Sequence, residues 1–386
     1  MNIPRGDGVA LLRELVRIDS RNPSLVAGAP GEQAVAVALA DVLTAWGFDA
    51  RLQEAAPGRP NVVATLRGRQ GAGGGSRSLM FNGHIDIVGV EGMTHQPFEA
   101  AESGGRIFGR GACDMKGGVA AMCAAAAQLK GELKGDLIVT AVVDEEWQSL
   151  GTSFLLASGV RADAAIVTEP TRMAIMPAHK GFAWIEITIH GRAAHGSRWD
   201  IGVDAIRFAG LLLAELDRVD ADDLPRRTHP LLGRASLHAS AIEGGIGLST
   251  YPDRCVVRIE RRTIPGEGSA DVVREVNEAC ARVRDRRPEF EAEVTLLFAQ
   301  PPSDVAPGAP IVVALSETLR DRGMPTTLTG MSAWTDAALL NQGGIPAICF
   351  GPGDMGLAHA AEEYIEVREI EVATEVLVAL ARNWCT

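Results

Sequence analysis

Three acidic residues stand side by side at the end of an apolar segment. Asp144, Glu145 and Glu146 directly follow the apolar run 137–143. Adjacent carboxylates repel one another, and they do so more strongly near a dry core. A solvated strand end would explain the three acids simply, whereas a cation bound opposite them would make their grouping favourable. The rest of the sequence has to decide between these two interpretations.

Other side chains that can bind metal also follow expected strands. His84 and Asp86 end one short apolar segment, and Glu169 ends another. Asp114 lies in the glycine-rich turn GRGACDMKGG, just before a helical pattern. In open α/β sheets, ligands bind where the strands end at their carboxyl edge. We therefore expect one crevice to collect these groups, and carboxylates with imidazole suit zinc, cobalt or manganese.

Each of these motifs is weak when it is taken alone. A histidine after a strand is usually an ordinary structural residue, and TEP is typical of a turn. The glycine-rich turn could indicate phosphate binding, but it lacks the GxxxxGK[ST] spacing and has an acid at its centre. Only the joint placement of the motifs at strand ends predicts a metal site.

Alternating strand and helix patterns predict a parallel sheet that positions these residues. Helical apolar spacing occurs in 11–18, 31–47, 116–130, 150–159, 309–322 and 368–384. Strand-like segments are 61–68, 78–86, 136–146, 163–170 and 345–351. The glycine-rich stretch 68–78 between two of them is expected to be a surface loop.

The pattern changes between residues 181 and 297. This part reads strand, helix, strand, strand, helix, strand, which is a ferredoxin-like order. We therefore expect an α/β fold with two domains. Residues 1–180 and 298–386 would form a mainly parallel-sheet catalytic domain with helices on both faces, and 181–297 an inserted ferredoxin-like α+β domain.

Composition limits the classes of partner and compartment. A chain of 386 residues with 46% hydrophobic residues is long enough for two domains. Its net charge of −12 argues against nucleic acid or an anionic membrane as partner. Charged residues interrupt the N-terminal segment, so that we expect no signal peptide, no membrane span and a cytoplasmic protein. The six cysteines are scattered without a CxxC pair, which favours buried thiols over disulfides or thiolate zinc.

The motifs occur in the order seen in one family. GHIDIV, GRGACDMKGG, DEEWQSLGT, TEP, GRAAHGS, RTIPGE and GPGDMGLAHAAEEY span most of the chain. They resemble the dizinc amidohydrolases, a family that includes acetylornithine deacetylase, succinyl-diaminopimelate desuccinylase, aminoacylase and glutamate carboxypeptidase. The motifs together are specific for the family but not for the substrate.

The resemblance implies two divalent metal ions bridged by Asp114. His84 and Glu169 would hold one ion, and Glu146 and His359 the other. Zinc is the expected metal, with cobalt or manganese as alternatives.

The resemblance also implies catalytic roles. Glu145 would be the general base for a water activated by the two metals. Asp86 would accept the second ring N–H of His84, and Asp144 would support the site from behind. His195 resembles the inserted-domain histidine that, in dimeric relatives, reaches the neighbouring subunit's site. A homodimer joined through the inserted (dimerisation or lid) domain is therefore expected.

The expected substrate is a small N-acyl amino acid, as for an acetylornithine deacetylase. Arg262 could hold its free carboxylate through two hydrogen bonds, with Arg261 as the competing candidate because adjacent strand residues point in opposite directions. Ser332 and His195 are further candidate substrate-binding residues. The pocket departs from many relatives, since Ser249 and Thr250 stand where asparagine is common.

Two further enzymatic readings and one non-enzymatic reading stay open. The same site could cleave a dipeptide or a C-terminal peptide residue, or an N-formyl or N-carbamoyl group. The chain could alternatively be an inactive metal-binding scaffold, although the presence of Glu145 beside Glu146 counts against that.

Overall fold

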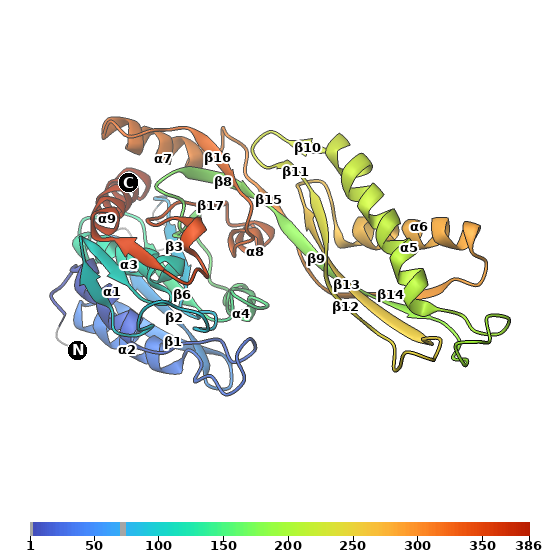
Figure 1. Ribbon diagram of the computed structural model, residues 1–386. Helices are drawn as coiled ribbons and strands as arrows, with labels where there is room; N and C mark the ends of the chain where they lie inside the picture. The colour runs from blue at the N-terminus through green and yellow to red at the C-terminus, as the bar shows by residue number, and fades with distance from the viewer. Residues whose placement is uncertain (1–2, 70–74) are drawn as a thin grey trace. The chain divides into compact units, whose positions relative to one another are not determined.

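The computed structural model describes residues 3–69 and 75–386 (Figure 1). Part of the expected loop 68–78 therefore lies outside the described residues. The chain divides into two compact units. Unit one comprises the described residues of Met1–Pro177, Val305–Thr329 and Thr335–Thr386, and unit two comprises Ala178–Asp304 and Gly330–Trp334.

A mainly parallel sheet forms the centre of unit one. Seven of its strands are hydrogen-bonded in the order β1 (Asp49–Ala56), β2 (Arg59–Leu66), β6 (Leu137–Val142), β3 (Leu79–His84), β7 (Ala165–Val167), β17 (Ala347–Cys349) and β8 (Ile175–His179). The four central strands, β6, β3, β7 and β17, are parallel, whereas β1, β2 and β8 pair antiparallel to their neighbours. The predicted parallel α/β sheet is confirmed.

The register of the parallel strands explains why polar residues distant in sequence meet. His84 pairs with Val142, Asn82 with Val167, and Val167 with Cys349. The carboxyl ends of these strands therefore lie level with one another. The residues that follow each strand must leave the sheet along the same edge.

Helices cover both faces of this sheet (Figure 1). They are α1 (Gly8–Arg17), α2 (Gln33–Ala45), α3 (Gly117–Gln128), α4 (Leu150–Ala157), α7 (Pro310–Asp321), α8 (Ala337–Gln342) and α9 (Val367–Trp384). Helix α3 packs on β3 and β6 and also contacts α1 and α9. Helix α4 contacts β1, β2 and α8, and α8 contacts β7 and β17. The small residues of α3 allow this close packing, because a Cβ at Gly118 would lie 2.0 Å from the main-chain oxygen of Thr168.

Short elements in unit one bring two loops together. A small sheet has the order β18 (Tyr364–Glu366), β5 (Arg106–Phe108) and β4 (Ala101–Ser103), with β18 antiparallel to β5. The tight turn η1 (Ala112–Lys116) follows β5, and the short helix η4 (Met355–Leu357) precedes β18. Because β5 and β18 are antiparallel, the chain after β5 lies beside the chain before β18.

Unit two has the predicted ferredoxin-like order. Strands β9 (Gly181–His190), β12 (Ser236–Gly244), β13 (Arg254–Thr263) and β14 (Glu291–Gln300) form an antiparallel sheet in the order β12-β13-β9-β14. Helices α5 (Ala205–Arg218) and α6 (Ser269–Arg286) contact one another and share an apolar core with the sheet. The opposite face of the sheet carries Phe182, Trp184 and Arg262 among others.

Several short elements of unit two lie outside this pattern. They are η2 (Val219–Asp223), η3 (Leu224–Arg226), β10 (Thr228–His229), β11 (Gly233–Arg234) and β15 (Ser303–Asp304), and the strand β16 (Leu328–Met331) follows later in the chain. The sequence placed the end of the inserted domain at residue 297, but β14 continues to Gln300 because it pairs with β9 as far as Phe182. The catalytic and dimerisation roles of the two units stay predictions.

Two expectations drawn from composition can be compared with the described residues. All six cysteines are buried and free, as the scattered spacing predicted. Among residues 3–69 and 75–386, no helix is both long and apolar enough to cross a bilayer.

Candidate metal centre

Five predicted ligand side chains of unit one meet at the carboxyl edge of the sheet. His84, Asp114 and Glu169 form one group, and Asp114, Glu146 and His359 form another. Within each group, one potential ligand atom from every residue lies within 4.8 Å of the others. Asp114 belongs to both groups, an arrangement that fits two ions sharing one carboxylate.

The interatomic distances show how closely these side chains approach one another. Nε2 of His84 lies 3.1 Å from Oδ1 of Asp114 and 4.0 Å from Oε1 of Glu169. Nε2 of His359 lies 3.0 Å from Oε2 of Glu146 and 3.5 Å from Oδ2 of Asp114. The two oxygens of Asp114 therefore point toward different histidines, as a bridging carboxylate requires.

The electrostatics of the cluster favour added positive charge. Burial raises the pKa of Glu145 and of Glu169 well above the ordinary value, and neighbouring carboxylates raise both further. Burial lowers the pKa of His84, but the hydrogen bond that its ring donates to Asp114 and the charge of Glu145 outweigh this and raise the pKa well above its usual value. A hydrogen bond with Glu146 raises the pKa of His359 to about 9. Divalent cations would stabilise the same carboxylates as anions, so that the donor set fits such ions.

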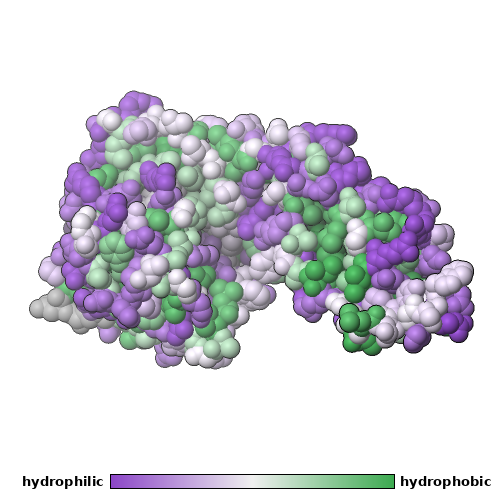
Figure 2. Space-filling model, in the orientation of Figure 1, coloured by the Kyte–Doolittle hydropathy of each residue, from purple (hydrophilic) through white to green (hydrophobic). Residues whose placement is uncertain are grey.

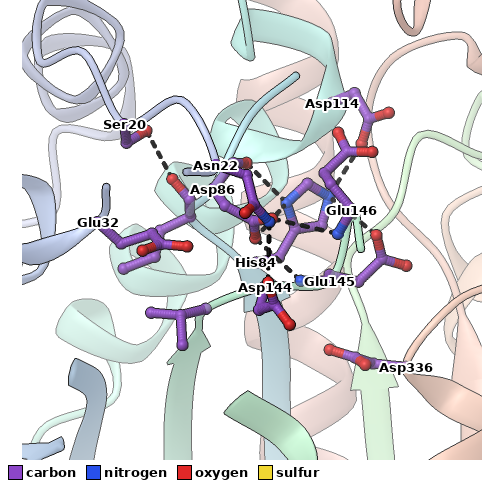
Figure 3. A network of polar contacts seen from close by, with 12 residues as sticks. Ser20, Asn22, Glu32, His84, Asp86, Asp114, Asp144, Glu145, Glu146 and Asp336 are labelled. Carbon is purple, nitrogen blue, oxygen red and sulfur yellow. Dashed lines mark hydrogen bonds and ion pairs between the residues drawn. The ribbon is translucent and has the colours of Figure 1, made fainter. Parts of the chain in front are cut away.

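The backbone turns sharply just before Glu145 and Glu146. Strand β6 ends at Val142, and Asp144 then adopts a left-handed backbone conformation with φ of 68°. This turn ends the alternation of the strand, as the sequence required if a base and a ligand are adjacent. The backbone N–H groups of Glu145 and Glu146 each donate to the Asp86 carboxylate at 3.1 Å (Figure 3).

Asp86 contacts His84 differently from the expectation. Nδ1 of His84 lies 3.0 Å from the main-chain oxygen of Asp86 and 3.6 Å from its Oδ1. The main-chain oxygen is thus the nearer acceptor for His84. The carboxylate of Asp86 instead accepts hydrogen bonds from the backbone N–H groups of Glu145 and Glu146 and, at 2.8 Å, from Nδ2 of Asn22. Asp86 holds the imidazole through its backbone and the acidic turn through its side chain.

A buried ion-pair network supports the acidic turn from behind. Nη1 of Arg59 lies 2.9 Å from Oδ1 of Asp144, and Nε of Arg59 donates to Glu32 at 2.9 Å. Nδ2 of Asn22 donates to Asp144 at 3.1 Å as well as to Asp86 (Figure 3). The sequence predicted a supporting role for Asp144 but missed Asn22, Glu32 and Arg59. Asn22 precedes Pro23 in a typical loop dipeptide, which is the one local signal that marks this segment.

Asp336 is a further buried acid beside the cluster (Figure 3). Its Oδ2 accepts a hydrogen bond of 2.8 Å from Oγ1 of Thr152. Burial raises the pKa of Asp336 to about 7, and its charge in turn contributes to the raised pKa of Glu145 and of Glu169. Asp336 was not among the predicted site residues.

The remaining predicted residues belong to unit two. His195 is exposed, and its Nδ1 lies 2.8 Å from Oγ of Ser197. Ser332 is also exposed, and it falls in the short segment Gly330–Trp334 that belongs to unit two and not to the expected catalytic domain.

Arg261 and Arg262 point to opposite faces of the sheet in unit two. Arg261 is fully buried and lies 3.0 Å from Glu267 and 3.2 Å from Glu275 of α6. Arg262 is 31% exposed on the other face, with its Nε 2.7 Å from Oε1 of Glu260. Of the two arginines, only Arg262 is therefore accessible, and it already has an intramolecular partner.

Comparison with known proteins places this arrangement in a family. The sequence matches the profile of "Peptidase family M20/M25/M40" over residues 80–383. The chain belongs to this family. As a member of peptidase family M20/M25/M40, it is a hydrolase that acts on amide bonds.

Three similar proteins of this family differ in their reactions. The chain is 31% identical to an acetylornithine deacetylase of Myxococcus xanthus, over 89% of this chain and 90% of the relative. It is 30% identical to the N-formyl-4-amino-5-aminomethyl-2-methylpyrimidine deformylase of Bacillus subtilis (strain 168), over 90% and 88%. A solved Bacillus subtilis structure, described as a dinuclear metal binding peptidase from the M20 family, superposes with a TM-score of 0.75 at 18% identity, over 98% of this chain and 97% of that one.

Proposed function

We propose that the protein is a metal-dependent amidohydrolase that removes the acyl group from a small N-acyl amino acid, in the manner of an acetylornithine deacetylase. The observation that carries the proposal is Asp114, whose two oxygens face two separate groups of ligand side chains. The relative of 31% identity, an acetylornithine deacetylase, supports this choice of substrate class.

The proposed cofactor is a pair of divalent ions, zinc being the first choice and cobalt or manganese the alternatives. His84, Glu169 and Asp114 would hold one ion, and Glu146, His359 and Asp114 the other. When bound, such ions polarise the amide carbonyl and lower the pKa of water. The description of one structural neighbour as a dinuclear metal binding peptidase supports the number of ions.

Glu145 is the proposed general base. Its side chain is 10% exposed, and its Oε2 lies 4.0 Å from Nε2 of His84, so that it borders the ligand cluster without belonging to either ligand group. Its carboxylate would take a proton from the attacking water and then deliver that proton to the leaving amine. The raised pKa of Glu145 suits a group that must hold a proton between these two steps.

Unit two supplies the proposed substrate and subunit contacts. Arg262 would leave its ion pair with Glu260 and bind the substrate carboxylate instead, and Ser332 would be a further contact of the substrate. His195 would act in the site of a second copy of the chain, within a homodimer. The edge strand β12 and three exposed apolar residues, Trp199, Ile246 and Leu248, supply a surface for pairing, and Figure 2 shows apolar patches on this unit.

We place the protein in the cytoplasm. Six buried, unpaired thiols are compatible with a reducing compartment.

A second candidate is hydrolysis of an N-formyl or N-carbamoyl group, or of a dipeptide or a C-terminal peptide residue. The deformylase relative is 30% identical, almost as similar as the deacetylase, and it supports the formyl alternative. The peptidase description of the structural neighbour supports the peptide alternative. An inactive metal-binding scaffold is the non-enzymatic alternative, and Glu145 at the border of the ligand cluster counts against it.

A substrate panel separates these functions. Metal-loaded protein is assayed with N-acetyl and N-succinyl amino acids, N-formyl amines, N-carbamoyl amino acids and dipeptides, and kcat/KM is compared. We expect the N-acyl amino acids to be hydrolysed fastest. A faster reaction with another class would replace the proposed substrate, and bound metal without any hydrolysis would favour the scaffold.

A further inference from the structure

One fully buried carboxylate in unit one lies outside the proposed ligand set. The side chain of Glu363 is 0% exposed and accepts four hydrogen bonds. Its Oε2 accepts from Nη1 of Arg110 at 2.8 Å and from the backbone N–H of Gly111 at 3.0 Å. Its Oε1 accepts from the backbone N–H groups of Cys113 and Asp114, both at 3.0 Å.

The loop that carries Asp114 is shaped around this carboxylate. Gly111 has a left-handed φ of 78°, and a Cβ there would lie 2.5 Å from Cγ2 of Ile87. The N–H groups of Gly111, Cys113 and Asp114 therefore converge on one side of the loop, in the kind of backbone concavity that binds anions. The anion bound here is a side chain of the protein itself.

The same carboxylate belongs to the segment that carries His359. Glu363 follows His359 by four residues, and Nη1 of Arg110 also donates to the main-chain oxygen of Ala360 at 3.3 Å. Glu363 and Arg110 thus join two loops that are more than 240 residues apart in sequence. Each of these loops supplies a proposed ligand of the same ion.

We propose that Glu363 is a positioning residue of the metal centre, which fixes the backbone of Asp114 relative to the loop of His359. The inference rests on the proposed dimetal site. Removal of the carboxylate would leave three buried N–H groups without an acceptor and Arg110 without its ion-pair partner, and the loops would have to move to satisfy them. Groups that orient ligands in this way commonly change metal affinity about 10–100-fold when they are mutated.

The two ions should respond unequally to the loss of this carboxylate. Two of the three proposed ligands of one ion, Asp114 and His359, depend on the loops that Glu363 joins. The other ion shares only Asp114 and keeps His84, the last residue of β3, and Glu169, two residues after β7. Glu363 should therefore contribute more to the affinity of the ion bound by Glu146 and His359.

The test compares Glu363→Gln with Glu362→Gln in the full chain. Glutamine keeps the shape of the side chain, but its amide NH₂ cannot accept the hydrogen bonds that one carboxylate oxygen accepts. Glu362 is an exposed neighbour whose replacement removes the same charge. Metal-free protein is titrated with Zn²⁺ by calorimetry, and its thermal unfolding is recorded in parallel.

We expect Glu362→Gln to bind two ions, each with the affinity that it has for wild type. Glu363→Gln should bind one ion about 10–100-fold more weakly and the other with a smaller change. His359→Ala should remove the ion bound by Glu146 and His359. When Glu363→Gln is added to His359→Ala, the affinity for the remaining ion should fall only by the smaller of the two factors.

The outcomes separate this inference from the proposed function. Unchanged affinities in Glu363→Gln, with or without a lower melting temperature, would overturn the inference and leave Glu363 a purely structural residue. If metal-free Glu363→Gln does not fold, Glu363→Asp keeps the charge on a shorter side chain, and unchanged affinities in that variant have the same meaning. A wild type without two bound ions would overturn the metal centre and the inference together. Two ions without amide hydrolysis would overturn only the proposed reaction.

Discussion

Glu145 and Glu146 are chemically identical neighbours whose surroundings differ. The left-handed turn at Asp144 directs Glu146 toward His359, with 3.0 Å between Oε2 and Nε2, while Glu145 stays outside both ligand groups. Burial raises the pKa of both, more strongly at Glu145, where no hydrogen bond from an imidazole opposes it. Local geometry thus gives each residue a different proposed task.

Replacement of these two residues should produce opposite results. Glu145→Gln should keep two bound ions and lose about 10²–10⁴-fold in turnover, because the base is absent while the ligands remain. Glu146→Gln should lose one ion. Metal content from elemental analysis and kcat measured on the same preparations check both, and the reverse pattern would exchange the two roles.

Arg262 can be tested through the carboxylate of the substrate. Wild type should prefer an N-acyl amino acid to the corresponding C-terminal amide, and Arg262→Ala should reduce that preference by about 10–100-fold, the range expected for a charge-assisted hydrogen bond. Metal content should not change.

Arg258 supplies the matched control for Arg262. It lies on the same face of β13, where it pairs with Glu186 at 2.8 Å and with Glu243 at 2.9 Å. Arg258→Ala should keep the wild-type preference. Equal wild-type rates on acid and amide would show that the substrate carboxylate is not recognised and that the Glu260 pair is the permanent partner of Arg262.

His179 makes stability depend on pH in unit two. Burial lowers the pKa of His179 to about 4, from an ordinary value near 6.5, despite the contact between its Nδ1 and the main-chain oxygen of Lys180 at 3.0 Å. The unfolded chain therefore binds a proton at a higher pH than the folded chain does. The stability that this neutral ring allows is present above pH 6.5 and is lost as the pH falls to about 4.

The size of that loss can be measured by urea unfolding of the metal-free protein at several pH values. The pKa difference corresponds to about 3 kcal/mol at most. His179→Phe keeps an aromatic ring against Trp334 and should remove this part of the slope, whereas His190→Gln, at an exposed position, should not. A slope in His179→Phe equal to that of wild type would exclude His179 as the cause.

At the scale of elements, the strand ends need support from neighbouring segments. The acidic turn after β6 is held by Arg59 at the start of β2, by Glu32 just before α2, and by Asn22 in the loop after α1. These contacts are buried, and the carboxylates of Glu32 and Asp144 are 0% and 2% exposed. Support for the site therefore depends on packing between elements and not on local sequence.

Arg59→Met should test this support. It leaves two buried carboxylates without their cation, and the loss of one partner from a buried ion pair costs about 3–5 kcal/mol. The urea midpoint should fall, and metal affinity should fall with it because the acidic turn loosens. Arg51→Met, which removes an exposed arginine paired with Asp49 on β1, should leave both unchanged. A stable Arg59→Met with normal affinity would contradict the supporting role.

Hydrophobic periodicity predicted the long elements but not the short ones. Helices α2, α3 and α9 and strands β3, β6 and β9 carry clear apolar patterns, and the structure contains them near the expected bounds. Strand β1 was missed because most of its side chains are exposed or half-buried. Strands β4, β5 and β18 have three residues each, too few for a pattern, and they form because their backbones pair.

The candidate site divides in the same way. His84, Asp114, Glu146, Glu169 and His359 belong to local motifs, and the structure brings their side chains together. Arg59 and Asn22 contact the site through partners 64 to 122 residues distant, and such long-range contacts cannot be read from a single sequence. Glu363 stands in the motif GPGDMGLAHAAEEY, but the motif does not show its contacts with Cys113 and Asp114, which are 250 and 249 residues away. Two strands after α5, namely β12 and β13, were predictable, because strand-like and helix-like apolar patterns alternate along this part of the sequence.

At the scale of the whole molecule, the proposed homodimer can be tested by subunit exchange. His195→Ala and Glu145→Gln chains should each be inactive. If His195 acts in the partner's site, a mixed dimer has one site that contains both intact residues. Activity should therefore partly return on mixing, while co-purification of two differently tagged chains confirms exchange. Proven exchange without recovery would place His195 in the site of its own chain or outside catalysis.

The interruption of unit one by unit two has a consequence for biosynthesis. The main part of unit two, Ala178–Asp304, is complete before the ribosome has made the segment of unit one that includes β17, His359 and α9. We therefore expect the later segment of the chain to fold first, in spite of the usual order from the N-terminus. Strand β7 must wait for its neighbour β17, because the two strands pair in parallel. The protein can acquire the proposed two-ion centre only after the segment that contains His359 has been made, and a chain released before that point would be left with ligands for at most one ion.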